Sequence, residues 1–191
     1  MNYKFLIHIA LLLISSPAKA WEEICQRTDI HEVSFEYVYP MIGFAALSVF
    51  IGSVWEHGWS NAEDYQYAMM QCAAVVVSLF GAYFLSAYLI NQVRIKKLAQ
   101  RDDMLLSQQF AGYSMTVIFL LQILTGLLPD LGIISVLLQF YTIYLVWEGT
   151  GKLLDIEEEK RTAFTVIASA IILVCPPLLR YVFDKLNFIL N

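Results

Sequence analysis

Residues 68–101 read AMMQCAAVVVSLFGAYFLSAYLINQVRIKKLAQR, an apolar run that ends in a group of basic side chains. A helix needs about 20 apolar residues to cross the hydrocarbon core of a bilayer, and residues 68–90 are long enough. Basic residues directly after such a run are typical of a cytoplasmic loop. This stretch therefore predicts a membrane-spanning helix whose carboxyl end lies in the cytoplasm.

The same apolar pattern recurs on both sides of this stretch. The chain of 191 residues is 59% hydrophobic and only 15% charged, whereas a soluble domain carries about 25% charged residues. The composition therefore predicts an all-α integral membrane protein with a five-helix membrane domain over residues 37–191. The predicted transmembrane helices cover about 37–54, 68–90, 110–128, 131–147 and 163–183.

The basic residues are unequally distributed between the two sides of the membrane in this predicted topology. All but Arg180 and Lys185 of the 12 lysines and arginines lie before the first span or in alternate connections after it. Cytoplasmic loops of membrane proteins are enriched in lysine and arginine. We therefore expect a multi-pass protein whose N-terminus is cytoplasmic and whose C-terminus lies outside.

The first 36 residues contain a segment with the appearance of a secretory signal. Lys4, an apolar stretch at 5–14 and Ala18-Lys19-Ala20 resemble a signal peptide that is cleaved after Ala20. Cleavage would reverse the orientation of every later loop against the charge pattern. We therefore expect residues 1–36 to form a short interfacial or re-entrant helix on the cytoplasmic side, broken at Pro17. A cleaved signal peptide is the alternative.

Several short motifs follow one another in a specific order. They are Ser16-Pro17 with Trp21 and Ile24, Tyr37 with Pro40 and Gly43, Tyr113-Ser114, and Gly149 after the fourth predicted span. Their order resembles that of bacterial members of the YIP family, named for interaction with Ypt/Rab GTPases, and the resemblance covers almost the whole chain. It implies a five-span protein of the cell (inner) membrane. The family often has a proline three residues after the Tyr-Ser pair, and Val117 in its place predicts a straighter third span.

The sequence contains no set of residues that indicates catalysis. No Ser-His-Asp, Cys-His or paired-carboxylate set can be assembled on one side of the membrane, and the histidines and cysteines lack metal-ligand spacing. We therefore expect no enzyme, no cofactor and no metal site. The net charge of −5 also argues against nucleic acid as a partner.

The resemblance implies a role in membrane traffic and shaping. We expect a non-enzymatic protein that organises membrane lipids together with a membrane-protein partner or further copies of itself. The GTPase binding that named the family is not carried over, because the Asp-Leu-Tyr-Gly-Pro segment of eukaryotic relatives does not occur in this sequence.

Three glutamines, Gln71, Gln122 and Gln139, lie inside predicted spans, where polar side chains are costly. Gln122 and Gln139 flank the turn at 129–132 at similar distances, so we expect them to face each other at similar depth. A hydrogen bond between them would stabilise the hairpin by about 0.6 kcal/mol. The alternative is that they line a polar pathway, in which case the protein is a small transporter or a channel subunit.

Overall fold

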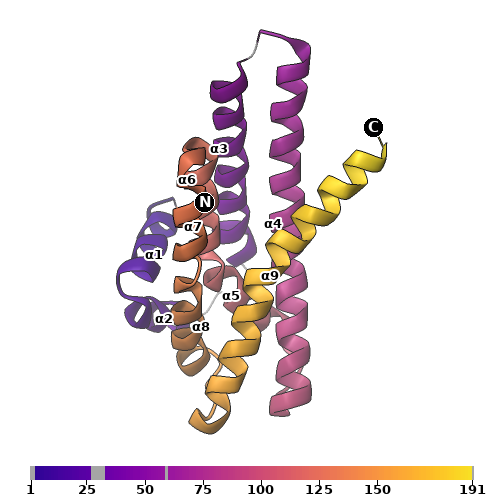
Figure 1. Ribbon diagram of the computed structural model, residues 1–191. Helices are drawn as coiled ribbons and strands as arrows, with labels where there is room; N and C mark the ends of the chain where they lie inside the picture. Colours follow the sequence, from indigo (N-terminus) through magenta and orange to yellow (C-terminus); the bar gives the residue numbers. More distant parts are fainter. Residues whose placement is uncertain (1–2, 27–32, 59, 191) are drawn as a thin grey trace.

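The computed structural model describes residues 3–26, 33–58 and 60–190, and all regular secondary structure in these residues is helical. Figure 1 shows long helices running side by side, with shorter helices packed along one flank. The helices are α1 (Tyr3–Ser15), α2 (Pro17–Cys25), α3 (Tyr39–His57), α4 (Ala62–Leu98), α5 (Met104–Ser114), α6 (Thr116–Leu127), α7 (Gly132–Leu138), α8 (Tyr141–Lys152) and α9 (Glu158–Leu190). A π-helix, η2 (Ser34–Val38), precedes α3, and a 3₁₀ turn, η3 (Pro129–Leu131), precedes α7.

Within the described residues, three helices are long and apolar enough to cross a membrane, namely Ser34–His57, Ala62–Leu98 and Glu158–Ile189. Two further candidates are pairs of helices bent at a short break. The pair α5–α6 is bent by 41° and the pair that joins residues 129–138 to α8 by 42°. Five candidate spans result when each bent pair counts as one. The fold is that of an all-helical membrane protein with a short N-terminal helix.

The helix pair that contains Val117 is bent and not straight, so the expectation drawn from that residue was wrong. The break lies at Met115, between α5 and α6. The Thr116 hydroxyl donates to the carbonyl oxygen of Tyr113 at 2.6 Å. A side chain that bonds to a carbonyl of the preceding turn competes with the backbone ladder and bends a helix. The bend between α5 and α6 therefore forms at a threonine, without a proline in the third span.

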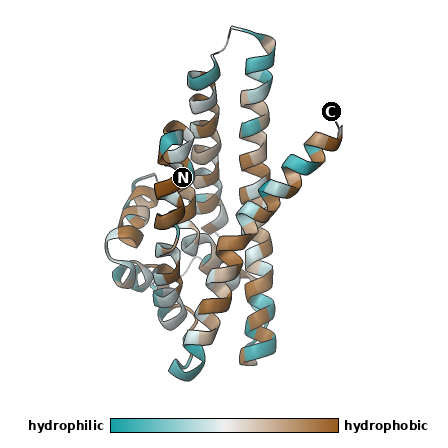
Figure 2. Cartoon of the chain, in the orientation of Figure 1, coloured by the Kyte–Doolittle hydropathy of each residue, from teal (hydrophilic) through white to brown (hydrophobic). Residues whose placement is uncertain are grey.

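The long helix α4 is the central element of the fold. It packs against α3, α5 and α9, and in Figure 1 α3 runs beside its upper part while α9 crosses it and leads away toward the C-terminus. Figure 2 shows brown, apolar residues along the middle of these helices and teal, polar residues toward both ends. The polar residues at the lower end belong to the carboxyl end of α4 and the start of α9. This distribution is the one expected for helices that cross a bilayer.

The connection between α4 and α5 is folded around a buried arginine. Arg94 donates to the side chain of Gln100 at 2.9 Å, to the Ser107 hydroxyl at 2.8 Å and to the carbonyl oxygen of Asp103 at 3.0 Å. Asn91 donates to the Asp102 carboxylate at 2.7 Å. These bonds hold the last turns of α4 in place, so the helix continues to Leu98, beyond the apolar run that ends at residue 90.

Candidate functional site

A cluster of large side chains joins the N-terminal segment to the bundle. Trp21 of α2 is fully buried. Its ring stacks on Phe110 with centroids 5.8 Å apart and meets the edge of Tyr113 at 6.1 Å, and its indole N–H donates to the carbonyl oxygen of Leu145 at 3.0 Å. Tyr37 packs against Tyr113 with centroids 4.8 Å apart. The tryptophan cluster, as we name Trp21, Tyr37, Phe110, Tyr113 and Gly149, thus brings together motif residues that are far apart in the sequence.

Gly149 makes the docking of α2 on α8 geometrically feasible. A Cβ atom at this position would lie 2.6 Å from Cζ2 of Trp21 and 2.9 Å from Cε2 of Phe110. Neither ring has room to withdraw, because both are fully buried. A residue without a side chain is therefore required where α8 meets the indole ring.

An ion pair lies beside this contact on the exposed side of α2. Lys152, the last residue of α8, donates to the Glu22 carboxylate. This hydrogen bond, and then the charge of the ammonium group, lowers the pKa of Glu22 below its ordinary value of 4.5. The pair joins the exposed side of α2 to the end of α8.

The other motif residues fall into two groups. Ser16 separates α1 from α2, Pro17 opens α2 in its first turn, and Ile24 is buried beside Trp21 in the same core. Ser114 is also buried, next to the bend. The two exceptions lie in the first turns of α3, where Pro40 is half-buried and Gly43 is exposed, with no atom within 4 Å of the point that a Cβ would occupy.

Helices α1 and α2 form a unit that we call the α1–α2 hairpin. α1 packs against α2 and α6, while α2 packs against α8. One side of α1 is buried, and the residues on its other side are apolar but exposed. The buried residues are Leu6, Ile9, Ala10 and Leu13, and the exposed residues are Tyr3, Ile7, Leu11 and Ile14. The hairpin therefore presents an apolar stripe along its outer side.

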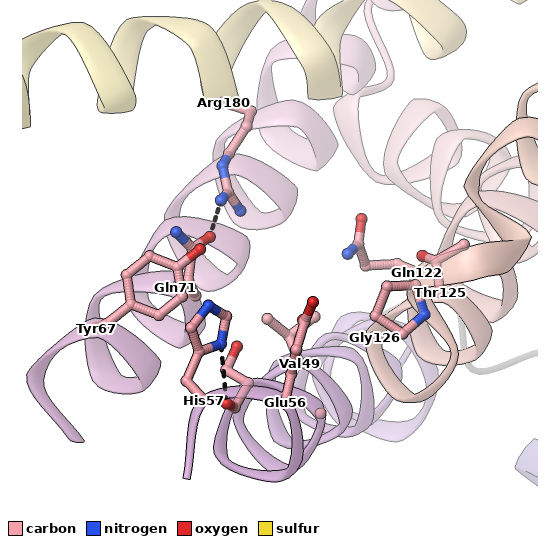
Figure 3. A pocket seen from close by; sticks show the side chains of 12 residues that line it. Val49, Glu56, His57, Tyr67, Gln71, Gln122, Thr125, Gly126 and Arg180 are labelled. Carbon is pink, nitrogen blue, oxygen red and sulfur yellow. Dashed lines mark hydrogen bonds between the residues drawn. The ribbon is translucent and has the colours of Figure 1, made fainter. Parts of the chain in front are cut away.

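A polar cavity of about 190 Å³ lies between α3, α4, α6 and α9, near the carboxyl end of α3 and the beginning of α4. Helices α3 and α6 approach closely beside it, and a Cβ on Gly52 would collide with the carbonyl oxygen of Gly126. Figure 3 shows side chains from all four helices converging on this space. The polar side chains in its lining are Ser53, Glu56, His57, Tyr67, Gln71, Gln122, Thr125 and Arg180.

The charged groups of the cavity come from different helices. Arg180 of α9 donates to the side-chain oxygen of Gln71 and forms an ion pair with Asp184 at 3.3 Å. His57 Nδ1 lies 3.3 Å from the carbonyl oxygen of Ser53. Glu56 forms no ion pair within the described part of the chain, and Figure 3 places it across the cavity from Arg180.

The structure separates the two glutamines that the sequence placed together. Gln122 lines the polar cavity, whereas Gln139 lies at the break between α7 and α8. No hydrogen bond joins them in the described ranges, so the predicted interhelical bond is not formed. Counting residues from the turn assumed a regular helix, and the 42° bend after α7 removes that regularity.

The cavity could not be identified from the sequence, because its charged residues lie in separate segments. The available signals were Gln122 inside a predicted span and Gln71 and Arg180 near the ends of apolar runs, because polar residues inside or beside spans are candidates for functional sites. The pairing of these two residues depends on how α4 and α9 cross, which hydropathy does not indicate.

A family model described as the Yip1 domain matches residues 11–179. The matched region includes the whole tryptophan cluster and every cavity residue except Arg180. No curated protein and no solved structure matches the chain. Because the family model covers most of the sequence, the comparison confirms the resemblance inferred from the short motifs, and the chain belongs to the Yip1 domain family.

Proposed function

We propose that this Yip1 domain protein is a non-enzymatic organiser of the bilayer that acts by occupying more area in one half of the membrane than in the other. The observation that carries the proposal is the docking of the α1–α2 hairpin against α6 and α8 by the tryptophan cluster. Its partners are membrane lipids, together with a membrane protein or a further copy of the chain.

The proposed location is the cell inner membrane, with the N-terminus in the cytoplasm and the C-terminus outside. The ion pair of Glu22 with Lys152 supports this orientation, because it places the hairpin beside the basic end of α8. Ala20 and Trp21 are both fully buried inside α2. Signal cleavage between them would cut a packed helix, which supports retention of the N-terminal segment.

The hairpin acts as a wedge in this proposal. Its exposed apolar stripe favours burial among acyl chains at about 25 cal/mol per Å² of apolar surface. At the opposite end of the molecule, no short helix packs beside α3, α4 or the end of α9 in Figure 1. Extra volume in the cytoplasmic half expands that leaflet, so the membrane bends with its cytoplasmic side convex.

Reconstitution into large vesicles tests this function. The wild-type protein is expected to convert them to tubules or small vesicles as the protein-to-lipid ratio rises. The double substitution Ile7→Gln and Leu11→Gln makes the exposed side of α1 polar, and it is expected to reduce this remodelling strongly because the buried side of the hairpin is unchanged.

The matched control is Phe188→Gln with Ile189→Gln, which changes two exposed apolar residues at the other end of the protein. This control is expected to remodel vesicles as the wild type does. The proposal fails if the wild type leaves vesicle shape unchanged, or if the α1 variant and the control behave alike.

A second candidate function, a small transporter or a channel subunit, is favoured by the polar cavity. Gln122 lines it and Gln139 does not, so the two glutamines form a matched pair. If the cavity is part of a pathway, Gln122→Leu lowers solute flux into reconstituted vesicles, whereas Gln139→Leu leaves the flux unchanged. Equal effects of both substitutions, or no flux in the wild type, would reject this function.

A further inference from the structure

The polar cavity carries opposite charges on opposite walls. Glu56 projects from the last turn of α3, and Arg180 projects from α9 (Figure 3). The two do not form an ion pair with each other, and each faces the same space. A molecule that bridges the walls would therefore need a cationic end and an anionic end.

The wall around Glu56 suits a small cation. The carboxylate lacks a cationic partner among the described residues. The rings of His57 and Tyr67 lie beside it in the lining and contact each other with centroids 4.8 Å apart. An ammonium group is attracted both by a carboxylate and by the face of an aromatic ring.

The opposite wall suits an anionic oxygen. The Arg180 guanidinium has five N–H donors, of which Nε is directed at Asp184 and one on Nη2 at Gln71. The remaining donors are available for a further acceptor. Gln122 adds an amide donor to the same lining, whereas the Thr125 hydroxyl donates to the carbonyl oxygen of Leu121 at 2.8 Å. Arginine with neighbouring neutral donors is a common arrangement for binding phosphate.

We propose that the polar cavity binds a zwitterion with a primary ammonium group and an anionic phosphate oxygen, the chemistry of phosphoethanolamine. Glu56 takes the ammonium end and Arg180 the phosphate end. The source of this group is either the headgroup of a phospholipid in the outer half of the bilayer or a free solute from outside.

Size and position agree with such a ligand. The cavity, at about 190 Å³, is smaller than the pockets of about 300–1,000 Å³ that hold drug-sized molecules. It lies between the end of α3 and the beginning of α4, at the level where an apolar run gives way to polar residues. This is the depth at which phospholipid headgroups lie.

The test is a comparison of three probes on the purified full-length protein in nanodiscs of phosphatidylglycerol. Phosphoethanolamine, ethanolamine and inorganic phosphate are titrated by calorimetry. Phosphoethanolamine is expected to bind at least about tenfold more tightly than either single-charge probe, because both walls are then occupied. Equal binding of phosphoethanolamine and ethanolamine would show a simple cation site and overturn the proposal, and equal binding of phosphoethanolamine and phosphate would overturn it as well.

Two substitutions test which side chain binds the ammonium end of the ligand and which binds its phosphate end. Glu56→Gln is expected to weaken phosphoethanolamine about tenfold while leaving phosphate binding unchanged, and Arg180→Gln is expected to weaken both probes. Glu63→Gln, in the first turn of α4 and outside the lining, is the matched control and is expected to bind as the wild type does. Because Glu56 is exposed, its substitution leaves the packing intact and decides the test even if Arg180→Gln is unstable. Unchanged binding in Glu56→Gln would reject the site.

A second set of nanodiscs distinguishes the two sources. If the natural ligand is a lipid headgroup, phosphatidylethanolamine in the disc prevents the binding of free phosphoethanolamine. If it is a free solute, binding is the same in both discs. Neither result depends on vesicle remodelling by the α1–α2 hairpin, so the failure of that function and the failure of this site are separate outcomes.

Discussion

Gly149 lies against the indole ring of Trp21, and the space between them is smaller than a methyl group. Alanine favours a helix over glycine by about 1 kcal/mol, so helix propensity alone would make Gly149→Ala stabilising. Overpacking a buried contact costs about 1–3 kcal/mol. The steric cost is the larger effect, because the atoms in the way belong to rigid, buried rings.

We therefore predict that Gly149→Ala lowers the thermal unfolding midpoint of the purified protein and increases protease access to α2. Gly43→Ala is the matched control, since a Cβ there would have no atom within 4 Å. That variant is expected to unfold at the wild-type temperature or above it. Equal midpoints for the two variants would contradict the close packing described at Trp21.

Thr116 connects the bend between α5 and α6 to the segment before α3. Its hydroxyl lies 2.7 Å from the hydroxyl of the buried Tyr37 and also bonds to the carbonyl oxygen of Tyr113. Thr116→Val keeps the shape and removes the hydroxyl, which leaves a buried phenol without this partner. We predict a loss of about 1–3 kcal/mol in the free energy of unfolding.

A double-mutant cycle with Tyr37→Phe measures this interaction. The double variant is expected to lose less stability than the sum of the single variants, because Tyr37→Phe removes the group that Thr116→Val leaves unpaired. Strict additivity in denaturant unfolding would show that the hydroxyl pair contributes nothing to stability.

At the scale of elements, hydropathy indicated apolar helices but not their shapes. The apolar runs overlap α3, α4 and α9 and the two bent pairs. The break at Met115 depends on a threonine side chain, and the break at Gln139 has neither proline nor glycine beside it. Apolar composition encodes neither break, because side-chain hydrogen bonds such as that of Thr116 leave the hydropathy of a run unchanged.

For the N-terminal segment, too, the sequence indicated the helices but not the surface on which they pack. Pro17 indicated the end of one helix and the start of another, and it does begin α2. The surface that α2 covers could not be predicted from periodicity, because the contact needs Gly149 and the backbone of Leu145, both from α8. The family motif supplied the residues of this contact, whereas only the structure supplies their juxtaposition.

The contact between α2 and α8 has a predicted pH dependence. The pKa of Glu22 is lowered in the docked hairpin by the hydrogen bond from Lys152. A lowered pKa means that this ion pair supports docking above the ordinary value of 4.5 and ceases to do so as the pH falls through the value in the folded protein. The effect is small, because both side chains are largely exposed.

Acrylamide quenching of Trp21 measures this dependence, in a chain whose other tryptophans are replaced by phenylalanine. Quenching is expected to rise slightly as the pH falls below about 4.5 in the wild type. Glu22→Gln is expected to show the higher quenching already at neutral pH and no step on acidification. A step in quenching of the same size in both proteins would show that a titratable group other than Glu22 causes it.

For the whole molecule, the number of spans depends on the two bent pairs, α5–α6 and α7–α8. As complete spans they place the turn at Asp130 outside the membrane, which gives five crossings. We predict that Asp130→Cys in intact cells reacts with a membrane-impermeant maleimide, as Lys185→Cys does. Lys97→Cys is expected to react only after permeabilisation. Labelling of Lys185→Cys but not of Asp130→Cys would mean that the pairs enter the membrane and return without crossing it.

The breaks in these pairs also bear on how the protein is made. α6 has 12 residues and α7 has 7, so at 1.5 Å per residue they reach only about 18 and 10 Å, and neither alone crosses a hydrocarbon core of about 30 Å. As spans, α6 must therefore cross together with α5, and α7 together with α8, and the two pairs then form a hairpin over residues 104–152. A hairpin enters and leaves on the same side, so the direction in which α9 is threaded is already decided by the earlier helices. Shortening or deleting this unit would impair packing while leaving the translocation of the carboxyl end unchanged.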